Sequence, residues 1–488
     1  MLRPANVLSL GCGAGIIFIT VTHAQGGSAE AAFDLVIGGA DVVTPSDVRR
    51  LDIGVRDGLI QALGEPGSLG PAGRVIDARG NVVLPGVIDP HVHCRIHSHH
   101  VDDLPTALAA AAAGGVTTAI VHLLPTASVA ATPLDLLEEF RELGRRESPI
   151  DFSFHAWLPE RPGTLEQIPE LLAAGVPSFK LFCAYKSIGR MASDGFLIRT
   201  MDTIGRHGGI LLVHAEDGEL IDARIAAQRE RGRIGPSDYL WTHPDEAEWI
   251  AVAKTLGYAR ATGCPLYVVH VSTPRGIDLI EAAKHEGQRV FAETCVQYLE
   301  LTDAELRRWG PLAKVSPPLR DAPANEGLWR HLAAGRIDAV GSDHSPHSRE
   351  TKAPGYRDIF DAWYGAPGVQ TLLPVMWDAF RRRSLPLPLL ARVLSEAPAR
   401  IFGLERKGTI APGMDADLVI VDPDREQELR GADQLGHSGY TLYEGRRIRG
   451  WPVTTLRRGD VLVDGGRLRA ARGGGRFLTR RAAVAGTA

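Results

Sequence analysis

The chain has 488 residues, a formal net charge of −4, 44% hydrophobic residues and 23% charged residues. This composition is ordinary for a globular protein, and the length is too great for a single small domain. No long basic run precedes the arginine-rich end of the chain, so the charge gives no argument for a nucleic-acid partner. The five cysteines are scattered without a CxxC pair, which predicts reduced and mostly buried thiols.

Residues 1–32 differ from the rest of the chain. A mostly apolar stretch, 7–21, follows Arg3 and precedes residues 22–24 (Thr-His-Ala). This order resembles a secretory signal that ends in a small-x-small cleavage site. The stretch is short and interrupted by glycine, so we expect no membrane span. A disordered extension is the equal alternative, because the residues that follow are small or polar.

Short strands punctuated by glycine and proline are predicted in two separate parts of the chain. The first group lies in residues 33–85 and the second in residues 403–465. Because both groups flank one large middle region, we predict a smaller composite β-sandwich domain built from both chain ends. Residues 466–488 are predicted to form a C-terminal tail.

The middle region, 86–402, alternates predicted strands and helices. Such alternation implies a parallel sheet, and about eight repeats over this length fit a (β/α)8 barrel of the TIM type. A doubly wound open sheet is disfavoured, because no GxGxxG follows a strand and polar residues gather at many strand ends. The strand candidates are 117–123, 150–154, 178–182, 210–214, 266–271, 290–293 and 339–342, and the clearest helices are 133–143, 165–174 and 245–261.

Residues that can bind metal follow several of the apolar runs. His91 and His93 end one such run, and a strand directs both side chains to the same face. Active sites of barrels lie at the carboxyl ends of the strands, where this chain also places Lys180, His214, His270 and Asp343. Such residues suit two divalent ions, provided that CO₂ converts the lysine into a bridging carbamate. The alternative for Lys180 is a structural ion pair.

The ordered motifs resemble those of the amidohydrolase superfamily, close to the cyclic amidases of the hydantoinase and dihydropyrimidinase group. The resemblance covers residues 33–480. It rests on GVIDPHVH (86–93), SFKLFCAY (178–185), HAED (214–217), VVHVS (268–272), ETCVQYL (293–299), SPPLR (316–320), SDHSP (342–346), GTI (408–410), ADLV (416–419) and GRFL (475–478).

This resemblance implies a binuclear centre, with Zn²⁺ as the expected ion. It assigns His91, His93 and Asp343 to the more buried ion. It assigns His214 and His270 to the more exposed ion, and carboxylated Lys180 bridges both together with a hydroxide. It further implies that Asp343 acts as general base and then general acid.

The resemblance also assigns the substrate contacts. Tyr185 would donate a hydrogen bond to the developing oxyanion, and backbone groups of Ser316 would hold the ring amide. Tyr364 stands where hydantoinases often carry asparagine, a change that is tolerable if the substrate contact there uses the backbone. Arg95 resembles the arginine that binds the substrate carboxylate in dihydroorotases.

The loop that carries His97, His99 and His100 is unusual for these groups. We expect a solvated histidine-rich loop there, with support of the metal ligands or an extra cation site as alternatives.

The predicted activity is hydrolysis of a cyclic amide such as a hydantoin, a dihydropyrimidine or a related imide. Allantoinase or dihydroorotase activity on the same apparatus is the alternative. A non-catalytic scaffold is disfavoured, since such relatives typically lose metal ligands and this chain keeps all six. The resemblance implies a homotetramer or homodimer in the cytoplasm, unless residues 1–24 act as a signal peptide.

Overall fold

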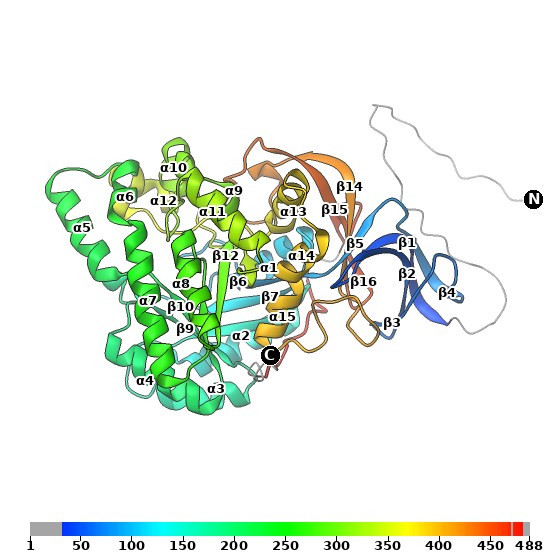
Figure 1. Ribbon diagram of the computed structural model, residues 1–488, viewed down its shortest axis with the longest axis horizontal. Coiled ribbons are helices and arrows are strands. Elements are labelled where there is room, and N and C mark those ends of the chain that lie inside the picture. Colours follow the sequence, from blue (N-terminus) through cyan, green and yellow to red (C-terminus); the bar gives the residue numbers. More distant parts are fainter. Residues whose placement is uncertain (1–31, 470–471, 482–488) are drawn as a thin grey trace, which may run out of the picture.

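The computed structural model describes residues 32–469 and 472–481 (Figure 1). The predicted signal or extension therefore lies, apart from its last residue, outside the described residues. Within those two ranges, no helix is long and apolar enough to cross a bilayer. Figure 1 shows a large body of strands and helices beside a smaller group of strands, in which blue segments from early in the sequence meet orange segments from late in it.

An eight-stranded parallel sheet forms the large body, which confirms the predicted TIM-type barrel. Neighbouring strands follow the order β13-β12-β11-β10-β9-β8-β7-β6. A parallel bridge between Val92 and His344 joins the first strand to the segment after the last one. The strands are β6 (Val87–Val92), β7 (Val116–Leu123), β8 (Asp151–Trp157), β9 (Ser178–Phe182), β10 (Ile210–His214), β11 (Leu266–Val268), β12 (Val290–Cys295) and β13 (Ala339–Gly341).

Helices accompany these strands. The predicted helix 133–143 extends to Glu147 as α2, and it starts from a capping box in which Thr132 and Asp135 bond each other's backbone N–H. The helices are α1 (Leu104–Ala113), α2 (Pro133–Glu147), α3 (Ile168–Ala173), α4 (Asp194–His207), α5 (Gly218–Glu230), α6 (Pro236–Thr242), α7 (Asp245–Thr262), α8 (Pro274–His285), α9 (Val296–Glu300), α10 (Asp303–Trp309), α11 (Ala322–Ala333), α12 (Arg349–Lys352), α13 (Leu372–Arg382), α14 (Leu387–Ala391) and α15 (Ala397–Phe402).

Two predicted strands end earlier than expected. The strand predicted over 266–271 ends at Val268, and the strand predicted over 339–342 ends at Gly341. The reason lies in the backbone, because His270 and Asp343 adopt φ values of 42° and 45°. A left-handed residue cannot continue a strand, so the chain turns where these polar side chains stand.

A nine-stranded sheet forms the smaller domain, and its strands come from both chain ends as predicted. Its order is β17-β16-β15-β14-β5-β1-β2-β3, with β4 paired to β1. Strand β5 lies antiparallel to β14, where Val83 faces Ile420 in the buried core. The strands are β1 (Phe33–Val43), β2 (Val48–Arg56), β3 (Leu59–Gly64), β4 (Ala72–Asp77), β5 (Val82–Pro85), β14 (Leu418–Glu428), β15 (Arg447–Arg457), β16 (Asp460–Asp464) and β17 (Arg467–Leu468). The exact residue limits of the domains stay a prediction.

The amino ends of barrel strands β8 and β9 are covered by residues from late in the sequence. Arg480 donates from Nε to Ser153 Oγ at 2.8 Å and from Nη2 to Ser178 Oγ at 2.7 Å. Lys407 Nζ lies 2.6 Å from both Asp151 Oδ2 and Asp417 Oδ2. These buried contacts close the barrel at the end opposite to the predicted site.

Candidate metal centre

The six predicted metal ligands meet in one cavity of about 400 Å³ at the carboxyl ends of the barrel strands. All six side chains line it, and each residue is at most 9% exposed. The strand framework therefore brings together residues that are far apart in the sequence: His91, His93, Lys180, His214, His270 and Asp343.

His91, His93 and Asp343 form the first group of the site. His91 Nδ1 lies 2.6 Å from Glu293 Oε1, which fixes the ring and leaves Nε2 buried without a hydrogen-bond partner. The Nε2 atoms of His91 and His93 lie 3.2 Å and 3.4 Å from Asp343 Oδ1. An imidazole held at one nitrogen by a carboxylate and free at the other is the usual form of a metal ligand.

His214 and His270 form the second group. His214 Nδ1 lies 3.0 Å from His270 Nε2, and His214 Nε2 lies 2.8 Å from Glu216 Oε2. Ser316 Oγ donates to the same carboxylate oxygen at 2.6 Å. Burial raises the pKa of Glu216, but the hydrogen bond and charge of His214 outweigh burial and lower it to about 2. Glu216 is therefore anionic at neutral pH and orients His214.

Lys180 lies in the middle of β9 and is 1% exposed. Burial lowers the pKa of its ammonium group to about 8, although the charges of Asp343 and Glu293 oppose this shift. Among the described residues, no carboxylate oxygen lies within the 4.0 Å limit of an ion pair with Lys180. The alternative of a structural ion pair therefore lacks a partner in the part of the chain that the structure describes.

Three side chains at this site come from backbone positions that L-residues rarely adopt. Tyr185, His270 and Asp343 have φ values of 70°, 42° and 45°. Each such residue costs about 1–3 kcal/mol relative to a relaxed backbone and is typical of functional sites. The strain aims these side chains into the cavity at the ends of β9, β11 and β13.

The structure brings three of the four predicted substrate contacts to the cavity. Tyr185, Ser316 and Tyr364 line it, and the Tyr185 ring centroid lies 4.6 Å from that of His214 and 5.1 Å from that of Tyr364. Arg95 is not among the lining residues. Its side chain is 55% exposed and pairs with Asp103 at 3.7 Å, so its position differs from the one expected of a substrate clamp.

The histidine-rich loop divides into an outer and an inner part. His97 is exposed and lies 2.9 Å from Glu139 Oε2, as expected of a solvated loop. His100 is half-buried and lines the cavity, where it bonds Ser345 Oγ at 2.9 Å and stacks on His347 at 4.9 Å. His99 also lines the cavity, with its ring 4.4 Å from that of Trp363.

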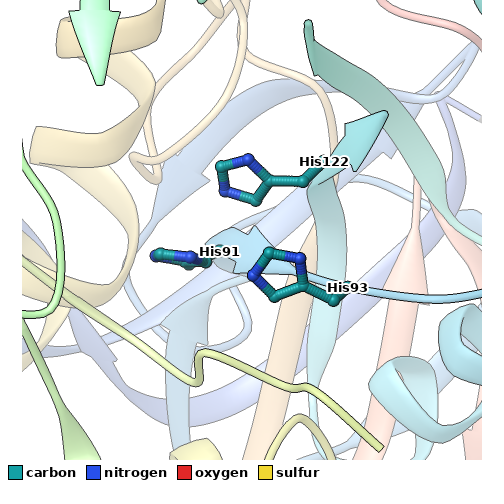
Figure 2. Close-up of side chains that lie close together, drawn as sticks. All are labelled: His91, His93 and His122. Atoms are coloured by element: carbon teal, nitrogen blue, oxygen red, sulfur yellow. The ribbon is translucent and has the colours of Figure 1, made fainter. Parts of the chain in front are cut away.

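Sequence reasoning missed His122, on β7. Its ring centroid lies 4.5 Å from that of His91 and 4.7 Å from that of His93, and both of its nitrogens are buried without a partner. Figure 2 shows the three rings turned toward a shared space, and one ligand atom of each lies within 4.8 Å of the others. The sequence alone could have indicated this residue, because His122 stands near the carboxyl end of the predicted strand 117–123.

We expect His122→Leu to weaken metal retention about 10–100-fold, because a buried imidazole next to two ligands would be lost. Metal remaining after dialysis against a graded chelator series measures this. His155→Gln is the matched control: the His155 ring centroid lies 4.8 Å from that of His122, but its nitrogens bond Ser178 Oγ and Pro90 O. Equal chelator resistance of the two variants would show that His122 has no part in metal binding.

Known proteins match this chain over most of its length. A model described as the amidohydrolase family matches residues 82–462. The chain is 35% identical over 461 residues to the L-hydantoinase of Paenarthrobacter aurescens, covering 92% of this chain and 98% of that protein. It is 38% identical over 442 residues to the allantoinase of Rubrobacter xylanophilus, covering 90% and 96%.

Solved structures extend the likeness to the whole fold. A D-hydantoinase structure superimposes with a TM-score of 0.88 at 33% identity, covering 92% of this chain and all 100% of that one. The match thus includes both the barrel and the smaller β domain. With the family match, the sequence identity and the fold in agreement, this chain belongs to the amidohydrolase family.

Proposed function

We propose that the chain is a hydrolase that opens the amide bond of a hydantoin, a dihydropyrimidine or a related cyclic imide with the help of two divalent metal ions. The observation that carries the proposal is the convergence of six buried ligand residues on one cavity. The similarity to an L-hydantoinase and a D-hydantoinase over more than nine-tenths of the chain supports the ring substrate.

The residues present fit two metal ions. His91 Nε2 is buried without a hydrogen-bond partner, which is costly unless a ligand satisfies it. It lies 3.2 Å from Asp343 Oδ1, and His93 Nε2 lies 3.4 Å from the same oxygen. His91, His93 and Asp343 would hold one ion, His214 and His270 the other, and Lys180 would reach both as a carbamate. We propose Zn²⁺, because imidazole and carboxylate oxygen suit it. When bound, the ions lower the pKa of a water molecule and polarise the substrate carbonyl.

Asp343 is placed to move the proton. Its Oδ1 lies 3.2 Å from His91 Nε2 and 3.4 Å from His93 Nε2, among the residues that would hold the ions. A carboxylate beside the attacking water can accept its proton and then deliver it to the ring nitrogen as the C–N bond breaks. Burial raises the pKa of Tyr185, so its hydroxyl stays protonated and can donate to the carbonyl oxygen. Backbone groups of Ser316 would hold the ring amide.

Allantoin is the second candidate substrate, because the identity to an allantoinase is 38% over nine-tenths of the chain. Dihydroorotate has less support, since Arg95 lies outside the cavity. From the family resemblance we also propose a homotetramer or homodimer in the cytoplasm.

A turnover panel on Zn²⁺-loaded protein tests the proposal. Hydantoin, dihydrouracil, allantoin and dihydroorotate are compared at one pH, and ring opening is followed for each. We expect hydantoin or dihydrouracil to have the highest kcat/KM. A preference for allantoin would select the second candidate. Failure on all four rings, with two metal equivalents confirmed, would reject this substrate class.

A further inference from the structure

Arg190 is a second arginine that sequence reasoning did not connect with the site. It follows β9 and the short helical turn Lys186–Ile188, which is bounded by left-handed residues at Tyr185 and Gly189. Its backbone N–H donates to Tyr185 O at 3.1 Å, so the loop folds back on itself. Arg190 thereby lines the same cavity as the metal ligands.

The Arg190 guanidinium is held firmly on one side. Its central carbon lies 4.4 Å from the centroid of the Trp157 ring, and Nη2 donates to Pro125 O. Both contacts fix the plane of the guanidinium against the cavity wall. The group is therefore preorganised, and little conformational freedom would be lost when it binds a ligand.

The other side of the same group has no partner. Arg190 Nη1 is buried without a hydrogen bond, and no carboxylate among the described residues forms an ion pair with this side chain. Burial lowers its pKa to about 10, so it remains a cation at neutral pH. Since a half-buried cation with a buried, unused donor is unfavourable, the geometry favours an anionic acceptor supplied from the cavity.

Two other arginines near the site are already occupied. Arg161 donates from Nη1 to Val129 O at 2.8 Å and from Nη2 to Ala127 O, so it holds the loop next to Pro125. Arg95 is exposed and pairs with Asp103. Of these three arginines, Arg190 alone lines the cavity. His100 also lines the cavity, but its imidazole cannot supply the negative charge that would balance Arg190.

We propose that Arg190 binds a carboxylate at the far end of a flexible ring substituent, so that among substituted hydantoins the preferred substrates are those with an anionic side chain. The proposal rests on the ring-opening function proposed above and names its substrate class. Tyr185 and Ser316 would hold the reacting amide while Arg190, five residues after Tyr185, holds the far end of the substituent. A guanidinium offers two parallel N–H groups to a carboxylate and fewer favourable contacts to a neutral amide.

The test uses two nearly isosteric rings, 5-(2-carboxyethyl)hydantoin and 5-(2-carbamoylethyl)hydantoin, on the Zn²⁺-loaded enzyme. We expect the carboxylate ring to have a kcat/KM about tenfold higher or more. Arg190→Gln should lower kcat/KM for the carboxylate ring to that of the carboxamide ring. The carboxamide ring itself should not be slowed, because glutamine can still donate to Pro125 O and hold the loop. Arg190→Lys should keep part of the ratio. Arg95→Met should leave it intact.

Several results would overturn the proposal. They are equal kcat/KM for the two rings in the unaltered enzyme, survival of the preference in both Arg190 variants, or its loss in Arg95→Met instead. Thermal unfolding and metal content identify a variant that fails to fold. If Arg190→Gln is such a variant, a carboxylate preference in Arg190→Lys equal to that of the unaltered enzyme overturns the proposal, and a reduced preference supports it.

Failure of the ring-opening function gives a different result. If neither ring opens, calorimetric titration of the metal-loaded protein with N-carbamoylglutamate and N-carbamoylglutamine tests Arg190 alone. A carboxylate preference that disappears in Arg190→Gln supports its role as an anion-binding residue, and equal affinities overturn it.

Discussion

Lys180→Ala is expected to remove both metal and turnover. The alanine variant lacks the only residue that could reach both ions from β9, and it leaves His214 and His270 as a two-ligand site, which is incomplete. Turnover of the preferred ring should fall by about 100-fold or more, as expected when metal binding is disrupted. Metal content by emission spectrometry and kcat/KM on the same sample measure both effects.

Lys352→Met is the matched control for loss of a buried lysine. Lys352 is fully buried and donates to Leu312 O at 3.2 Å and Lys314 O at 2.9 Å, and it does not line the cavity. Its replacement should lower the free energy of unfolding by about 1–3 kcal/mol for the carbonyls left unpaired, with both ions retained. A Lys180→Ala protein with both ions and full turnover would reject the two-metal proposal.

Asp343→Asn should separate proton transfer from metal binding. Asparagine keeps the shape and one oxygen ligand but cannot accept a proton, so kcat should fall about 10²–10⁴-fold while KM changes little. Metal content should exceed that of Lys180→Ala, which distinguishes the two variants. Steady-state kinetics with metal analysis make the measurement.

Asp338→Asn is the control for that experiment. Asp338 lies at the opposite end of the same strand, where it pairs with Lys284 at 2.7 Å. Turnover of this control should equal that of the unaltered enzyme. Full turnover by Asp343→Asn would remove Asp343 from the role of general base and leave it as a metal ligand only.

The barrel and its six converging residues could be predicted because both depend on strand periodicity. Alternating strands and helices imply a parallel sheet, and residues such as His214 at the end of an apolar run must then lie at one rim. No contact between side chains is needed for that inference. His122 follows the same rule, and it was missed because the apolar run continues for two residues beyond it.

The loops could not be predicted in the same way. The spacing of Arg95 from His93 suggested a substrate clamp, yet the side chain lies outside the cavity. Arg190 enters it because Tyr185 and Gly189 adopt φ values of 70° and 69°, which spacing does not encode. His100 likewise depends on a tertiary contact with Ser345. Loop positions follow from local dihedral angles and from contacts with distant residues. The sequence therefore identifies the loop residues but does not show which way their side chains point.

The long-range closure of the barrel by Arg480 has a consequence for biosynthesis. Ser153 and Arg480 are 327 residues apart in the chain. A ribosome adds about 5–20 residues per second, so β8 is synthesised tens of seconds before Arg480, which later bonds Ser153. During that interval the nascent barrel exposes strand ends and apolar surface, which is the kind of surface that chaperones bind. Rapid elongation or chaperone supply should therefore matter more for the yield of this enzyme than for a protein whose contacts are local.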